Sequence, residues 1–164
     1  MIKPLFQRIV VAYNGSQSSL HAVMYAILMA KQFKCHIKVV YVVDTVTIRQ
    51  LTMSKFMVKD EGEQIEGGLT TDGDRNLTYA VKLAAGKGIK IDAELRKGAV
   101  WSEIISAADE FKADLILLGG TADSAPFVNR HDVISRQNGE IIGSAHCSVM
   151  LVRQPQIEQL FKIA

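Results

Sequence analysis

The chain has 164 residues, 48% of them hydrophobic, and its 19 basic and 17 acidic residues leave a net charge of +2. That length fits one globular domain with a sizeable core, and the near balance of charge argues against partners such as nucleic acid or an anionic membrane. No stretch approaches the roughly 18 apolar residues of a spanning helix, and no signal-peptide pattern opens the sequence. We therefore expect a cytoplasmic protein with no membrane partner.

Hydrophobic periodicity predicts strands that alternate with helices. Apolar runs rich in β-branched residues at 8–13 and 36–44 predict two strands buried within a sheet, and segments 90–96, 114–118 and 148–152 are predicted as three further strands. Apolar residues at helical spacing follow them near 20–28, 77–84, 101–108 and 133–142. This alternation predicts an α/β fold, a three-layer sandwich around a five-stranded, parallel, doubly wound sheet.

Ligands of such sheets bind outside the carboxyl ends of the strands, where the strand order reverses. Two loops compete for that place, "AYNGSQSS" after the first strand and "GGTADSAPFVNRHDVISR" after the fourth. If the two strands are neighbours, both loops line one crevice. The spacing of the residues alone leaves that adjacency open.

Four stretches in this order, "RIVVAYNGSQSSLHAVMYAILMA", "KVVYVVD", "KGAVWSEIISAADEFKADLILLGGT" and "IIGSAHCSVMLV", resemble the universal stress protein (UspA-like) family over most of the chain. The resemblance implies an adenine-nucleotide alpha-hydrolase-like fold with strand order 3-2-1-4-5, which brings the two loops together. It also implies a homodimer, and ATP in the crevice for one subgroup of the family.

The phosphate side of that subgroup's motif is only partly present. Gly119 stands on the first glycine position and Gly120 follows it, but Ala122 occupies the place of the second glycine. The closing Gly-Ser pair falls on Ser135 and Arg136, and the loop before it is longer than in the subgroup. Glycines matter here because they let backbone N–H groups approach phosphate oxygens.

The adenine side is better preserved. Asn14 replaces the aspartate that helps to hold adenosine in the subgroup, and Val42 matches the residue whose backbone meets adenine. ATP or AMP is thus a candidate ligand, with no cofactor established. The resemblance gives as candidate nucleotide contacts Ala12, Asn14, Val42, Gly119, Gly120, Arg130, Ser135 and Arg136.

The long loop after the fourth strand leaves three interpretations open. In the first, the guanidinium groups of Arg130 and Arg136 bind phosphate through paired hydrogen bonds, and the Ser135 hydroxyl lies beside them. Alternatively the loop folds on itself, Asp132 caps the last helix and the arginines pair with Asp123 and Asp132. The third interpretation is an unrelated small ligand.

No catalytic or metal-binding constellation emerges from the sequence. Ser16 lacks a nucleophile-elbow pattern and is better explained as a helix N-cap. The pair His131 and Asp132 lacks the further ligands of a metal phosphohydrolase, and the two cysteines match no metal-ligand spacing. Trp101 is predicted to anchor its helix to the sheet.

The last strand and the tail indicate partners. The apolar strand Ser148, Val149, Met150, Leu151 and Val152 would lie at a sheet edge, and the family pairs through it, so we expect a homodimer there. Residues 1–152 are interpreted as the domain and 153–164 as an amphipathic tail, too short to be stable alone. The tail is expected to dock on its own dimer or on another protein.

The segment 45–74 is the least regular part of the pattern, and it could be a lid over the crevice or a mobile surface loop. We interpret the chain as a homodimeric, stress-linked binding or regulatory module that does not bind ATP through the subgroup's glycine pattern. The alternative is an ATP- or AMP-binding switch with slow hydrolysis and an altered phosphate loop.

Overall fold

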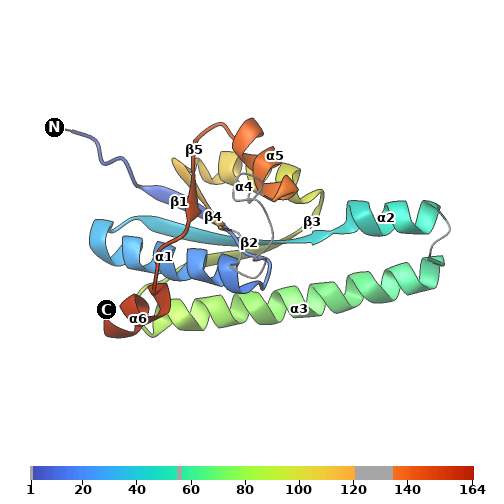
Figure 1. Cartoon of the computed structure of the whole chain (residues 1–164), viewed down its shortest axis with the longest axis horizontal. Helices are drawn as coiled ribbons and strands as arrows, with labels where there is room; N and C mark the ends of the chain where they lie inside the picture. Colours follow the sequence, from blue (N-terminus) through green and yellow to red (C-terminus); the bar gives the residue numbers. More distant parts are fainter. Residues whose placement is uncertain (1, 55–56, 121–134) are drawn as a thin grey trace.

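The computed structural model describes residues 2–54, 57–120 and 135–164, and its centre is one five-stranded sheet (Figure 1). All of its pairings are parallel and the order is β3-β2-β1-β4-β5. The predicted topology is confirmed, and so is the adjacency of the first and fourth strands. The strands are β1 (Arg8–Ala12), β2 (His36–Asp44), β3 (Asp92–Gly98), β4 (Leu115–Gly119) and β5 (Ser148–Val152).

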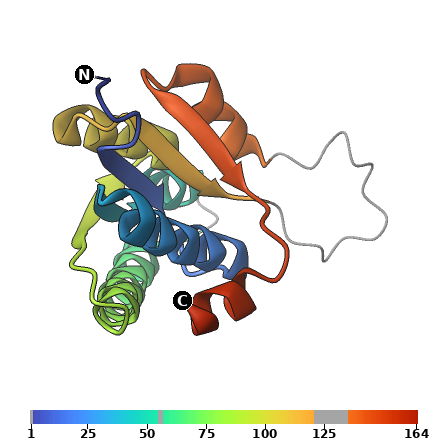
Figure 2. The ribbon, with the colours of Figure 1, turned by 90° about the vertical axis from the view of Figure 1, so that its left-hand side faces the viewer.

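Helices cover both faces of the sheet, which gives the predicted three layers (Figure 2). Helices α1 (Gln17–Phe33) and α3 (Lys59–Ala85) lie on one face, and α4 (Val100–Phe111) and α5 (Arg136–Ser144) lie on the other. Because successive strand residues point to opposite faces, Val11 joins the first core and Val10 the second. No helix among the described residues is long and apolar enough to cross a membrane.

Residues 45–53 and 59–74 are helical, so the prediction of an irregular segment was wrong there. Helix α2 (Thr45–Met53) follows β2 without a loop, and Asp44 caps it by accepting a 3.0 Å hydrogen bond from the backbone N–H of Thr47. The 27-residue helix α3 then returns to the sheet. Its first half is charged and rich in glycine, and it buries few apolar side chains, which is why hydrophobic periodicity failed to reveal it.

Two smaller predictions also need correction. Trp101 is 39% exposed and does not anchor α4, whose buried face includes Ile104 and Ile105. The helix before β5, α5, begins at Arg136, three positions later than the hydrophobic periodicity predicted. Ser135 is its N-cap. Asp132, which had been expected to cap that helix, lies outside the described residues.

The tail forms a helix, α6 (Ile157–Ile163), that packs on its own chain. Ile157 and Phe161 are buried in the core beneath α1, and the Lys87 ammonium lies 4.8 Å from the centre of the Phe161 ring. At the other end of the contact, Gln17 and His21 of α1 hydrogen-bond to the Glu158 carboxylate. The division of the chain at residue 152 stays a prediction.

We expect Phe161→Ala to lower the free energy of unfolding by about 3 kcal/mol, because truncating a buried aromatic side chain loses transfer energy and leaves a cavity. The matched control is Ile163→Ala in the same helix, where the side chain is 83% exposed and the loss should stay below about 0.5 kcal/mol. Urea unfolding followed by circular dichroism measures both. Equal losses would contradict the docking of α6.

Candidate functional site

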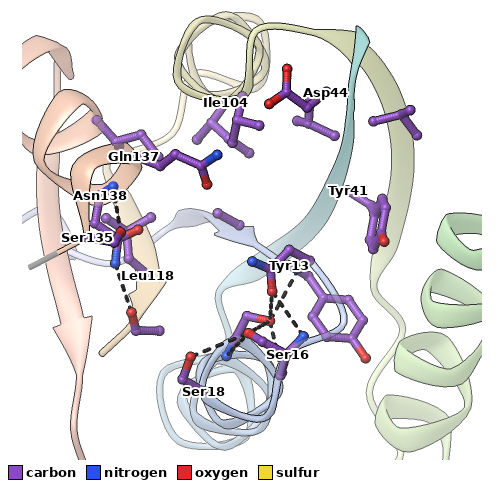
Figure 3. A pocket seen from close by; sticks show the side chains of 18 of the residues that line it. Tyr13, Ser16, Ser18, Tyr41, Asp44, Ile104, Leu118, Ser135, Gln137 and Asn138 are labelled. Atoms are coloured by element: carbon purple, nitrogen blue, oxygen red, sulfur yellow. Dashed lines mark hydrogen bonds between the residues drawn. The ribbon is translucent and has the colours of Figure 1, made fainter. Parts of the chain in front are cut away.

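A pocket of about 480 Å³ opens at the carboxyl ends of β1, β2 and β4 (Figure 3). Its walls come from the loop after β1, the end of β2, Leu69 of α3, the start of α4, the end of β4 and the start of α5. Because β1 lies between β2 and β4, the loops after β1 and β4 meet there. The volume lies within the range of small-molecule sites.

The loop after β1 is held by its own side chains. The Asn14 side-chain oxygen accepts hydrogen bonds from the Ser16 backbone N–H (3.0 Å) and from the Ser19 hydroxyl (2.8 Å). Ser16 caps α1 as predicted, since its hydroxyl oxygen accepts from the Ser19 N–H at 3.2 Å. The side chain that replaces the subgroup's aspartate thus has a structural role in shaping this wall.

Close packing explains Gly119, the last residue of β4, and Gly120, which follows it. A Cβ on Gly119 would lie 2.5 Å from the backbone carbon and oxygen of Ser18, so any side chain there would collide with the first turn of α1. A Cβ on Gly120 would lie 2.9 Å from the carbonyl oxygen of Val152. The Gly120 N–H donates to that same oxygen at 3.0 Å and is therefore already engaged within the sheet.

The start of α5 forms the opposite wall. The Ser135 hydroxyl accepts from the Asn138 N–H (3.1 Å), and the Asn138 side-chain amide donates to the Gly119 carbonyl (3.0 Å). Figure 3 shows the Gln137 side chain extending into the pocket. Gln137 and Asn138 were not among the predicted site residues, although a serine cap at position 135 places both in the first turn of a helix that faces the pocket.

Apolar and aromatic side chains line the pocket together with serine and amide side chains. Tyr13 and Tyr41 stack edge to face with ring centres 6.3 Å apart, and Tyr13 is only 4% exposed. Burial, with smaller contributions from Tyr79 and Tyr41, raises the pKa of the Tyr13 hydroxyl, which therefore stays neutral. Asp44 is the one charged side chain among the described lining residues.

The structure brings together six of the eight predicted contacts. The pocket lining includes Ala12, Asn14, Val42, Gly119, Gly120 and Ser135. The Arg136 side chain is 93% exposed and pairs with Glu140 at 3.6 Å, and it is not part of the described lining. Arg130 and Asp123 lie outside the described residues. That these residues contact a nucleotide stays a prediction.

Metal-binding chemistry has no support in the part of the chain that the structure describes, where no group of three His, Cys, Asp or Glu side chains is placed to hold an ion. His146 pairs instead with Asp109 at 3.1 Å. Cys35 and Cys147 are free thiols whose pKa values are raised, chiefly by burial, so neither has the low pKa of a reactive thiolate.

Comparison with known proteins identifies the family. The model of the universal stress protein family matches residues 5–153. The chain belongs to this family. A universal stress protein of Methanocaldococcus jannaschii is 32% identical over 157 residues, which cover 94% of this chain and 86% of that protein.

Solved universal stress protein structures share the fold. One, in complex with cAMP, has a TM-score of 0.63 at 22% identity, with 92% of this chain and 99% of that chain covered. A second, from Arabidopsis thaliana with AMP bound, has a TM-score of 0.62 at 15% identity, with 93% and 94% covered. At these identities the likeness shows that the architecture is common to all three.

We expect Gly119→Ala to lower the free energy of unfolding by about 2 kcal/mol, because the added methyl group would overlap the backbone of Ser18. Gly143→Ala in α5 is the matched control, since a Cβ there meets no atom within 4 Å. That change should be neutral or stabilising by up to about 1 kcal/mol. Chemical denaturation reports both values, and a Gly119→Ala protein as stable as the parent would refute the packing explanation.

Proposed function

We propose that this universal stress protein is a cytoplasmic, homodimeric regulatory module of the stress response that binds an adenine nucleoside or nucleoside monophosphate in the pocket. The observation that carries the proposal is the charge of the described lining, where apolar and aromatic side chains stand beside serine and amide side chains and the Asp44 carboxylate is the one charged group. Such a lining favours a planar, largely neutral group over a cluster of phosphates.

Gly119, at the end of β4, and Gly120 directly after it support the same choice. Gly119 and Gly120 are explained by contacts with α1 and β5, and the Gly120 N–H donates to Val152. A triphosphate cradle needs backbone N–H groups free to point at the ligand. Two relatives of the same fold are described with cAMP and with AMP bound, and both of those ligands combine adenosine with a single phosphate.

The second candidate function is an ATP-binding switch with slow hydrolysis, in which Arg130, outside the described residues, and Arg136, at the start of α5, take the place of the glycine cradle. Binding of ATP together with steady phosphate release would favour this alternative. The two proposals differ in ligand preference, so one binding series with AMP and ATP, with and without Mg²⁺, separates them.

We expect freshly purified protein to release adenosine or AMP on denaturation, or to bind added AMP more tightly than ATP. Mass spectrometry of the released molecules and isothermal titration calorimetry make the measurement. Val42→Trp should weaken AMP binding at least tenfold, because the indole would fill the pocket beside the end of β2. Val46→Trp is the control, at an exposed position of α2 outside the lining. No binding of either nucleotide by the parent protein would overturn the proposal.

The proposed homodimer forms through the edge strand β5. This strand pairs with β4 on one side only, and an open strand edge is a liability unless something covers it. Val149, Met150 and Leu151 are only partly buried in the single chain. A two-fold partner that covers the strand would resolve both features.

We expect sedimentation equilibrium to give the mass of two chains. Val149→Lys should shift the protein to the monomer, since two ammonium groups would be brought together across the two-fold axis. Ile163→Lys, at an exposed site in α6, should leave the dimer intact. A monomeric parent protein at micromolar concentration would contradict the dimer.

A further inference from the structure

Helix α2 and residues 59–66 of α3 form an arm that projects past the carboxyl edge of the sheet (Figure 1). The two parts of the arm pack on each other at Gly62, which is buried. A Cβ on Gly62 would lie 2.9 Å from the Thr52 hydroxyl and 3.4 Å from the Ile48 methyl group. This close approach makes the arm one packed unit.

The arm is weakly attached to the rest of the molecule. Helix α2 has no buried residue, and α3 has none between Gly62 and Gly73. At Gly73 the helix presses on Tyr41 and Leu95, so from there on α3 belongs to the main body. Between the two, Glu66 pairs with Lys97 of β3 at 3.4 Å, and an ion pair this exposed contributes little.

The helix is intrinsically weak where the arm meets the body. A Cβ on Gly67 or Gly68 would have no atom within 4 Å, so packing does not require glycine at either position. Glycine is nonetheless among the least favourable residues in a helix interior. Directly afterwards, the Thr70 and Thr71 hydroxyls donate to the carbonyls of Glu66 (2.8 Å) and Gly67 (3.0 Å), bonds that tend to bend helices.

We propose that Gly67 and Gly68 form a hinge about which the arm pivots against the sheet. The arm has a second connection to the body at Asp44, where β2 passes directly into α2. Asp44 and Leu69, which follows the hinge, both line the pocket. Both junctions between the arm and the body therefore lie at the pocket wall, and a pivot of the arm would be felt at these two side chains.

Spin labels on both sides of the hinge test the proposal without any ligand. Glu63→Cys and Lys82→Cys, in a Cys35→Ala and Cys147→Ser background, place two exposed labels 19 positions apart in α3. A straight helix would separate them by about 28 Å. We expect double electron–electron resonance to show a broad distance distribution with a population well below that value. The added pair Gly67→Ala and Gly68→Ala should narrow the distribution to one peak near the straight-helix distance.

Two controls make the result specific to the hinge. Labels at Lys82→Cys and Ser144→Cys, on opposite faces of the sheet, give the width expected from a rigid body, and Gly143→Ala should leave the Glu63–Lys82 distribution unchanged. A single narrow peak in the parent protein would overturn the hinge. A broad distribution that survives both alanines would overturn it as well, because the motion would then arise elsewhere. If the double variant fails to fold, each single alanine should narrow the distribution in part.

Discussion

The architecture depends on the complete burial of β1. Ile9, Val10 and Val11 are fully excluded from solvent, and the strand pairs with β2 on one side and β4 on the other. A strand buried on both faces and paired at both edges lies inside the sheet, and because both pairings are parallel the chain reaches its neighbours by crossover connections. The chain adds β2 and β3 on one side of β1 and then β4 and β5 on the other side. The loops after β1 and β4 meet at this change of side and form the pocket.

The same pocket shows why a glycine pair is an ambiguous signal. In the sequence, "GG" after a buried strand looks like a phosphate loop, and the family resemblance strengthens that interpretation. In the structure, Gly119 makes room for the first turn of α1 and Gly120 for the end of β5. Backbone approaching backbone and backbone approaching phosphate impose the same steric demand, so the residue type alone cannot tell them apart.

Sequence reasoning was strongest where burial sets the pattern and weakest where it does not. Four strands and the Ser16 cap were found because apolar runs and capping residues are local signals, whereas β3 carries charged residues along its length and has no buried residue. Helix α2 and the first half of α3 were missed because they bury almost nothing, so no apolar stripe records them. Gln137 and Asn138 were missed because their place in the pocket depends on where α5 begins, and the preceding loop carries no periodic signal.

The docking of α6 bears on how the protein is handled. Glu158 bonds to Gln17 and His21 in the first turns of α1, next to the serines that line the pocket, and the Lys87 ammonium donates to the carbonyl oxygen of Ala164, the last residue. Ile2 and Leu5, near the other terminus, are almost fully exposed. An affinity tag fused after Ala164 would therefore extend from the packed contact between α6 and α1, whereas a tag fused before Ile2 would extend from solvent-exposed chain and leave that contact intact.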